Sequence, residues 1–351
     1  MSKPFPKAPE VRRPKGFTLV ELMVAMTLGL ILLGIAFTLF DQLYDASDLA
    51  GTMADVNQNL RAGANLIARD LSTCGVGIPL GGIPLPGGGS ATLIGRPGPG
   101  ASTFPNTGFM PVMTPGSGLG PARGTIPTDV ITVISVNPLS RLGQQYLAGI
   151  TFTSTSARIT VAAGTNIAAG ASQVVPGQLI MLTNVNSSCL LTATAVDATA
   201  NTVTFTAGDV NDVLGLNQFP PSATTGTIGQ LQTTGTTGPP SFPSTTAYHI
   251  TMITYYLDTS TPRRLMRRVG AETPQPVALG IDVLQFSYDY YDSLGAVTAN
   301  QRTVPAPNQI RNVNLSMTAK ADHPARKSRR YYSNTINTSV VIQNLAYFNK
   351  Y

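Results

Sequence analysis

The longest apolar segment of the chain spans residues 17–40 and contains a single charged residue, Glu21. As a helix it would be about 36 Å long, enough to cross a hydrocarbon core of roughly 30 Å. Basic residues precede the segment, whereas four aspartates and no basic residue lie between it and Arg61. Because cytoplasmic flanks are enriched in Lys and Arg, this asymmetry predicts a transmembrane helix with a cytoplasmic N-terminus. A helix buried in a protein core is the alternative.

The apolar pattern continues beyond residue 40 with helical spacing, because apolar residues recur every three or four positions with polar residues between them. These positions are Leu49, Met53, Val56, Leu60, Ala64, Ile67 and Leu71. One helix over residues 17–72 would be roughly 84 Å long. We predict that its second half, residues 41–74, is amphipathic and packs on a globular head. A coiled coil is the alternative, although the stripe covers fewer than four heptads.

Gly and Pro dominate the next segment, where they occupy 24 of the 50 positions from Gly75 to Gly124. No regular element is expected at that density, so we predict a Gly/Pro-rich loop over residues 75–128. A second segment rich in Gly, Pro and Thr, residues 208–246, is also expected to be a loop.

Residues 129–351 have β-strand patterns and are expected to form the globular head. Apolar residues, many of them β-branched or aromatic, predict strands at 129–136, 178–183, 189–196, 202–206, 249–258, 265–269, 281–291, 313–317 and 338–345. Short turns and no helical segments separate these strands, which favours antiparallel pairing. The predicted fold class is α+β: one long N-terminal helix packed on an antiparallel β-sheet head with long Gly/Pro-rich loops.

The composition changes this picture little but excludes several kinds of site. Charged residues make up 11% of the chain, against about 25% in typical soluble proteins, which is typical of a bacterial surface or envelope protein. The net charge of +6 arises mainly in the first 16 residues, which hold five basic residues and one acidic residue. With two His and two Cys, the sequence excludes a His-rich metal site, a multi-disulfide scaffold and a Cys-His zinc module.

Catalytic motifs are also missing from the sequence. His249 and His323 are isolated, no G-x-S-x-G elbow occurs, and no Gly-rich loop ends in Lys-Ser or Lys-Thr. We therefore expect no enzyme activity, no cofactor and no metal site.

Glu21 is the anomaly of the apolar segment. A carboxylate within a membrane span costs about 2.5–3.5 kcal/mol on insertion scales, so it needs a partner. After Lys15, the next basic residue in the sequence is Arg61. Cleavage of the chain after Gly16 would create an ammonium group on Phe17, four residues from Glu21. The alternative is that Glu21 lies near the helix end and reaches the headgroups.

The segment Lys15-Gly16-Phe17-Thr18-Leu19-Val20-Glu21 resembles the type III signal of type IV pilins and pseudopilins. Such a signal has a short basic leader that ends in Gly, then Phe, and Glu at the fifth position of the mature chain. The resemblance implies that a prepilin peptidase removes the leader, residues 1–16, by cutting after Gly16 and then N-methylates Phe17. It also implies that Glu21 pairs with the terminal amine of a neighbouring subunit.

Four further segments resemble the PilW family of minor pilins and the related J-type pseudopilins: residues 69–75, 253–258, 265–268 and 283–288. Gln343 departs from that pattern, because Arg is expected before Asn344. The resemblance implies a minor pilin that primes the pilus or is built into it, near the tip, and supports pilus-dependent motility or attachment. A J-type pseudopilin of a type II secretion system, a tip adhesin and a DNA-uptake pilin are the alternatives.

Partners and location follow from the same resemblance. It implies contacts with the prepilin peptidase, with other minor and major pilins and with the inner-membrane assembly platform. The protein is expected in the inner membrane as a single-pass protein with a periplasmic head before assembly, and in the pilus at the cell surface afterwards.

Two features of the head leave alternatives open. Cys74 and Cys189 are expected in an oxidising periplasm, where they form either a disulfide or two free buried thiols. The basic run Arg326, Lys327, Arg329 and Arg330 precedes two tyrosines and is a candidate nucleic-acid contact. We favour a solvated hairpin rim, or a contact with acidic neighbours, for this run and for the other basic run, residues 263–268. Nucleic acid is therefore not an expected partner.

Overall fold

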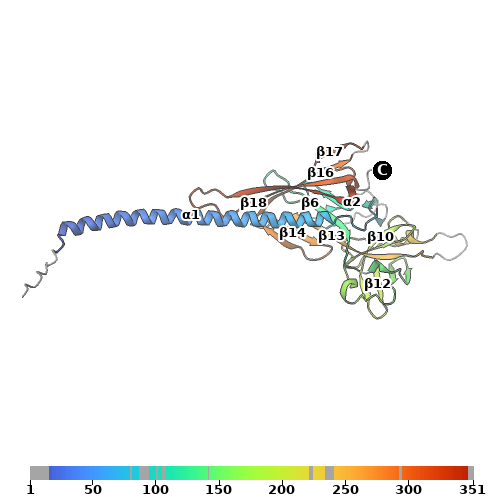
Figure 1. Ribbon diagram of the computed structural model, residues 1–351. Helices are drawn as coiled ribbons and strands as arrows, with labels where there is room; N and C mark the ends of the chain where they lie inside the picture. Colours follow the sequence, from blue (N-terminus) through green and yellow to red (C-terminus); the bar gives the residue numbers. More distant parts are fainter. Residues whose placement is uncertain are drawn as a thin grey trace, which may run out of the picture.

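The computed structural model describes residues 16–346 except 80, 87–94, 100–101, 105–107, 141, 221–223, 234–240 and 292–294. A long helix, α1 (Leu19–Ser72), extends away from a head made of antiparallel β-sheets (Figure 1). This arrangement confirms the predicted α+β class. The predicted leader, apart from Gly16, lies outside the described residues.

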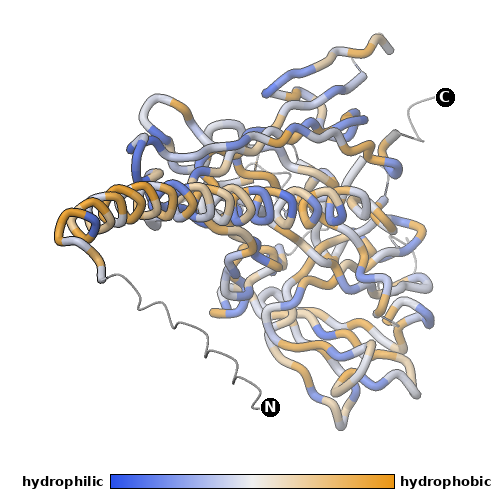
Figure 2. Tube along the Cα trace, turned by 60° about the vertical axis from the view of Figure 1, so that its left-hand side comes forward, coloured by the Kyte–Doolittle hydropathy of each residue, from blue (hydrophilic) through white to orange (hydrophobic). Residues whose placement is uncertain are grey.

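The two halves of α1 have different surroundings. No residue from Leu19 to Asp55 is buried, and the apolar residues of the first half colour the free end of the helix in Figure 2. The predicted stripe is buried from Val56 onward, where the helix packs against the head. Gly63 lies at the closest approach, because an added Cβ there would be 3.0 Å from Leu265 and 3.1 Å from Met317. Gly75 and Gly77, with φ of 79° and 71°, follow the helix end.

A seven-stranded sheet forms the centre of the head. β13 (Thr246–Leu257) is its longest strand and pairs with three neighbours. On one edge, β9 and β14 pair with successive parts of β13, and on the other edge β6 pairs with it. The other strands of this sheet are β5 (Met113–Gly116), β6 (Val130–Val136), β9 (Leu179–Thr183), β10 (Ser188–Thr192), β14 (Arg264–Val269) and β15 (Gln275–Leu279).

A four-stranded sheet in the order β17-β16-β18-β19 completes the main core. Its strands are β16 (Ile281–Tyr291), β17 (Val297–Gln301), β18 (Ile310–Lys320) and β19 (Ser333–Val341), followed by the short helix α2 (Gln343–Ala346). The second half of α1 packs on β15, β18 and β19, so the helix stripe, the seven-stranded sheet and this sheet share one hydrophobic core.

A second hydrophobic core lies beyond the end of α1. It is built around another four-stranded sheet, in the order β11-β12-β8-β7, which we call the distal module. In Figure 1 the distal module, around the label β12, lies past the C-terminal end of the helix. Its strands are β7 (Gly149–Phe152), β8 (Ser156–Thr160), β11 (Ala195–Asp197) and β12 (Thr202–Thr206).

Short elements account for the rest of the described chain. Two two-stranded sheets pair β1 (Ile83–Pro84) with β4 (Phe109–Met110) and β2 (Gly95–Arg96) with β3 (Ser102–Thr103). The 3-10 helices are η2 (Leu142–Gln144), η3 (Gly170–Ser172), η4 (Ile228–Leu231) and η5 (Pro307–Gln309).

Several predicted boundaries were wrong. The segment predicted as loop, 75–128, contains five short strands, one of which, β5, belongs to the central sheet. β7, β8, β15 and β17 were not predicted, and the last strand is β19, which ends at Val341 rather than extending to Leu345. These short strands depend on pairing with a partner strand, as β5 does with β6, and a local pattern cannot report such pairing.

Arg96 explains how the Gly/Pro-rich segment attaches to the head. Its guanidinium is buried and donates hydrogen bonds to the hydroxyl of Thr132 and to the carbonyls of Thr114, Pro115 and Val130, at 2.6–3.2 Å. Burial lowers the pKa of Arg96 to about 10, so the group remains a cation at neutral pH. One buried side chain therefore ties β2 to the central sheet.

Candidate functional site

The predicted cleavage site lies in exposed, non-helical backbone. Gly16, Phe17 and Thr18 precede the helix, and Phe17 is 89% exposed. An added Cβ at Gly16 would meet no atom within 4 Å, so the fold itself does not require glycine there. The bond between Gly16 and Phe17 is therefore open to an enzyme, and a requirement for glycine would have to come from that enzyme.

Glu21 has a partner within its own chain. Thr18 is the N-cap of α1: its hydroxyl accepts a hydrogen bond from the Glu21 N–H at 3.2 Å. In return, the Glu21 Oε2 accepts from the Thr18 N–H at 2.9 Å and from its hydroxyl at 3.0 Å. This reciprocal pair is a capping box.

The partners of Glu21 within the chain are thus the hydroxyl and N–H of Thr18, whereas the sequence had suggested a cation. The signal was present in the sequence, because Thr followed three residues later by Glu, ahead of an apolar run, is the pattern of a capping box. The pairing occupies Oε2 only. Among the described residues Oε1 makes no polar contact, so the carboxylate is oriented by its own chain and retains one oxygen for another group.

The segment around Glu21 presents apolar side chains on every side. The large apolar residues from Phe17 to Tyr44 are more than half exposed. By length and composition α1 is the one helix in the described chain that could cross a membrane. Burying such a surface in lipid or against other helices is strongly favourable, at about 25 cal/mol per Å² of apolar area.

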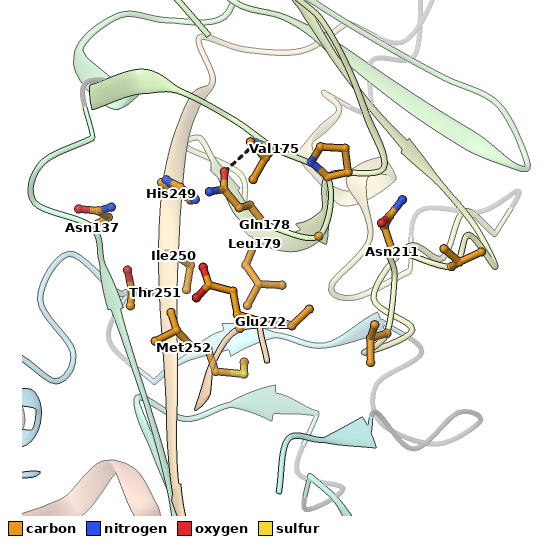
Figure 3. A pocket seen from close by; sticks show the side chains of 17 residues that line it. Asn137, Val175, Gln178, Leu179, Asn211, His249, Ile250, Thr251, Met252 and Glu272 are labelled. Atoms are coloured by element: carbon orange, nitrogen blue, oxygen red, sulfur yellow. Dashed lines mark hydrogen bonds between the residues drawn. The ribbon is translucent and has the colours of Figure 1, made fainter. Parts of the chain in front are cut away.

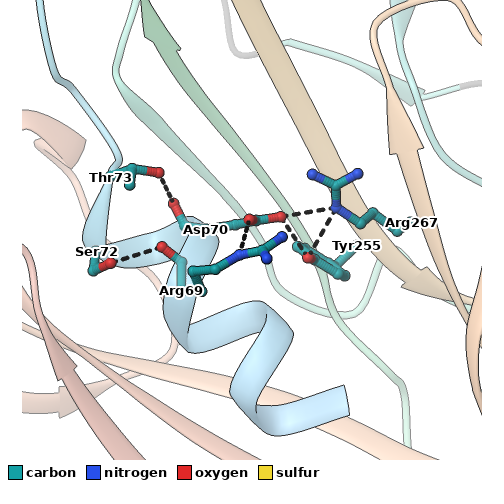
Figure 4. Close-up of polar contacts among 6 residues, drawn as sticks. All are labelled: Arg69, Asp70, Ser72, Thr73, Tyr255 and Arg267. Carbon is teal, nitrogen blue, oxygen red and sulfur yellow. Dashed lines mark hydrogen bonds and ion pairs between the residues drawn. The ribbon is translucent and has the colours of Figure 1, made fainter. Parts of the chain in front are cut away.

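A second polar cluster fixes the C-terminal end of α1 to the head (Figure 4). Asp70 is buried, and its Oδ2 accepts from the Tyr255 hydroxyl at 2.6 Å and from the Arg267 Nε at 2.8 Å. Burial raises the pKa of Tyr255, and the Asp70 carboxylate raises it further. The same carboxylate raises the pKa of Arg267 against the effect of desolvation.

The cluster joins three separate segments: residues 69–75, 253–258 and 265–268. These three segments are among those on which the expectation of a PilW-type or J-type protein rests. The helical pattern had placed Asp70 on the polar side of α1, but the structure buries it. Nothing near Asp70 in the sequence signals this, because Tyr255 and Arg267 follow 185 and 197 residues later.

The two cysteines do not form a disulfide. Both are free and buried, Cys74 in the main core and Cys189 in the second core. Burial raises the pKa of each thiol from 9.0 to about 12. Of the two alternatives drawn from the sequence, the structure therefore has the pair of free buried thiols.

The two basic runs make different contacts. In residues 263–268, Arg264 pairs with Asp258 at 2.6 Å and Arg267 with Asp70, so this run stabilises the head. In the second run, Arg326 lies 3.1 Å from Asp41 and Lys327 lies 2.7 Å from Asp45. These acidic neighbours are on α1, directly after the apolar segment.

Arg329 and Arg330 differ from these paired residues. Both are exposed, and their guanidinium groups make no hydrogen bond or ion pair within the part of the chain that the structure describes. In the second run, the expected contact with acidic neighbours therefore exists for Arg326 and Lys327. Arg329 and Arg330 instead match the other expectation, a solvated hairpin rim.

A cavity of about 380 Å³ lies where β9 and β14 separate along the edge of β13 (Figure 3). Its lining is mixed polar and apolar and includes His249, Glu272 and Asn211. Burial lowers the pKa of His249, so this side chain is neutral at pH 7. No described His, Cys, Asp or Glu residues group in threes that could hold a metal ion.

Comparison with protein families matches residues 11–37 to the family described as the prokaryotic N-terminal methylation motif. The match supports a type IV pilin-like or pseudopilin protein that is processed by a prepilin peptidase and assembles with other pilins. It does not distinguish the PilW type from other pilin-like proteins. No curated protein and no solved structure gave a significant match.

Proposed function

We propose that this protein is a minor pilin, cut after Gly16, N-methylated on Phe17 and placed at or near the tip of a type IV pilus. The observation that carries the proposal is the exposed motif around Gly16, Phe17 and Glu21 at the start of a helix whose apolar segment, residues 17–40, is not buried by any described part of the head. In this role the protein is a structural subunit rather than an enzyme, and it helps to start pilus assembly.

The shape of the head supports a position at the tip. In a filament built from parallel pilin helices, the space beyond the head belongs to the next subunit along the axis. The distal module extends beyond the end of α1 (Figure 1) and therefore competes for that space. At the tip no subunit follows, so the module fits there without a clash.

Processing gives the most direct test. Pili or membranes from cells with the wild-type chain should yield an N-terminal peptide that begins with N-methylated Phe17, measured by mass spectrometry. Gly16→Val should leave the full-length precursor in the membrane, because the peptidase then lacks its substrate. As a matched control, Gly29→Val changes a glycine with equally open surroundings inside the helix and should be processed normally. A mature chain that begins at another residue contradicts the assignment.

A J-type pseudopilin would share the processed terminus and the long helix. A deletion strain separates the two functions by the process that fails. Loss of surface pili and twitching supports the minor pilin, whereas loss of protein secretion with normal pili supports the pseudopilin. Loss of attachment or transformation alone, with normal pili, would support an adhesive or DNA-uptake role.

A further inference from the structure

We propose that the tip of the hairpin between β18 and β19, residues 321–332, binds the phosphate groups of anionic phospholipids through Arg329 and Arg330. The hairpin tip would lie on the membrane surface at the point where α1 leaves the bilayer. This inference requires residues 17–40 to span the membrane, but it does not depend on the role of the protein in a filament.

The depth of the hairpin tip follows from its contacts with α1. Asp41 is the first residue after the apolar segment 17–40, and Asp45 lies one helical turn later. Arg326 contacts Asp41 at 3.1 Å and Lys327 contacts Asp45 at 2.7 Å. In Figure 1 this hairpin is the part of the head that reaches furthest back along the helix. The hairpin tip therefore lies at the depth of the lipid headgroups.

The charges around the hairpin tip leave two cations free. Asp41 and Asp45 neutralise Arg326 and Lys327, whereas the remaining carboxylates of the region, Asp48 and Asp322, flank His323 at 3.9 and 2.5 Å. Arg329 and Arg330 are exposed and have no carboxylate within ion-pair distance among the described residues. Next to an anionic membrane surface, each such cation is attracted to the lipid phosphates.

The backbone of the hairpin tip holds these two arginines in a compact turn. The Ala325 N–H donates to the Arg330 carbonyl at 2.9 Å, and the Arg329 N–H donates to the Ala325 carbonyl at 2.8 Å. Arg329 has a φ of 52°, a left-handed conformation that closes the turn. Because the backbone of the turn is already ordered, it loses little conformational entropy when the arginines bind a ligand. A planar guanidinium group can donate two parallel hydrogen bonds to one phosphate.

Tyr44 gives independent support for a membrane surface at this depth. It lies on α1 between the two aspartates that hold the hairpin tip, and it is 71% exposed. Tyrosine is enriched at membrane–water interfaces, where its ring lies at headgroup level. The phosphates of a nucleic acid could also attract Arg329 and Arg330, but lipid phosphates are the ones already present at this depth.

The test uses the full chain in lipid nanodiscs, with a fluorescent dye on the thiol of a Ser328→Cys variant. Ser328 is exposed, whereas both native cysteines are buried, so the dye goes to the hairpin tip. Quenching is measured with spin-labelled phosphatidylglycerol and, separately, with spin-labelled phosphatidylcholine. Since each cation near an anionic surface contributes about a fivefold preference, the anionic lipid should be enriched around the dye by up to roughly 25-fold at low salt.

A double variant, Arg329→Asn and Arg330→Gln, should remove this preference, and Asn is chosen because it tolerates the left-handed conformation. The matched control, Arg61→Gln with Arg158→Gln, removes two exposed arginines far from the hairpin and should keep the preference. Equal quenching by both lipids, or a preference that survives the double variant, overturns the proposal. The solubilised chain is also tested for binding of short single-stranded DNA. DNA binding that is lost in the double variant, together with no lipid preference, would show that the two arginines bind nucleic acid and would overturn the proposal.

Discussion

Glu21 combines two roles that the usual substitution to alanine would remove together. Its Oε2 caps the helix through Thr18, and its Oε1 is free to accept from a neighbouring ammonium group. The capping role is worth about 0.5–2 kcal/mol of helix stability. Pairing in a water-free filament is worth more, because an unpaired buried carboxylate costs several kcal/mol.

We therefore expect Glu21→Gln and Thr18→Ala to behave differently. Glu21→Gln keeps an oxygen for the Thr18 N–H but loses the charge, so it should be processed normally and enter pili at a strongly reduced level. Thr18→Ala loses the hydroxyl of the capping box but keeps the charge and should enter pili at a level close to wild type. The measurement is the ratio of this protein in sheared pili to that in membranes. Equal ratios for Glu21→Gln and the wild type would show that the charge is not an assembly contact.

The two cysteines give a prediction about reactivity and pH. With pKa values raised to about 12, the thiols of Cys74 and Cys189 carry almost no thiolate at pH 8. Iodoacetamide should leave both unmodified in the folded chain and alkylate both in urea, as mass spectrometry can count without prior reduction. A disulfide-linked peptide containing both residues would contradict the structure.

The same pKa shift makes folding stability depend on alkaline pH. The folded state keeps these thiols protonated, whereas the unfolded chain releases their protons near its pKa of 9.0. The stabilising contribution is therefore fully present below pH 9 and is lost as pH rises from about 9 toward 12. Replacing both cysteines by Ala should flatten this part of the stability curve.

At the scale of elements, the junction of Asp70, Tyr255 and Arg267 decides how α1 is held by the head. Asp70→Asn leaves the half-buried Arg267 guanidinium without its charge partner. Removing one member of a fully buried ion pair costs about 3–5 kcal/mol, so we expect a cost of about 3 kcal/mol here. Tyr255→Phe removes one hydrogen bond to the carboxylate and should cost about 1–3 kcal/mol. Urea unfolding followed by circular dichroism measures both free energies.

Arg69→Gln is the matched control for the junction. Arg69 is next to Asp70 on α1, but its side chain is 68% exposed and lies 3.5 Å from the carboxylate, so its loss should change the free energy of unfolding by less than about 1 kcal/mol. A double variant of Asp70 and Arg267 should lower the free energy of unfolding by less than the sum of the two single variants, because the two side chains interact directly. Additive costs would show that the contact does not stabilise the junction.

The sequence predicts well those elements in which apolar residues recur regularly over a long continuous segment. The helix follows from apolar residues at steps of three and four, and β16 follows from alternation over about ten residues. β13 follows from a run of β-branched and aromatic residues, and β18 from alternation over residues 313–317, about half of its length. β5, with the sequence Met-Thr-Pro-Gly, has no strand pattern of its own and exists because it pairs with β6. Proline is tolerated there because β5 lies at an edge of the sheet.

The candidate sites also differ in whether a local sequence pattern can identify them. Gly16, Phe17 and Glu21 are adjacent in sequence, so a local motif identifies them. The junction joins residues up to 197 positions apart, and the hairpin tip meets α1 across 285 positions. Such contacts are set by the packing of the sheets, and a single sequence carries no local signal for them.

At the scale of the whole molecule, the protein is a long helix with a head that widens beyond the C-terminal end of that helix. The helix with its free apolar half can join a bundle of similar helices, but the head carries a second core past the end of α1. A subunit that repeats along a shaft must leave room for the next head. In the proposed pilus, the helix of such a chain is suited to the shaft, whereas its head fits only at an end.

We therefore expect this protein at one end of each pilus and at a small fraction of the abundance of the main subunit. Val185 lies in the turn between β9 and β10 and is 87% exposed, so a Val185→Cys variant can carry a gold label while the native thiols stay buried. Electron microscopy should show gold at a single filament end, and a label on the main subunit should decorate the whole length. A surface cysteine on the helix, in a Gly51→Cys variant, should react less in assembled pili, because neighbouring helices cover it. Gold spaced regularly along the shaft would contradict the tip position, since the distal module would then have to fit beneath the next subunit.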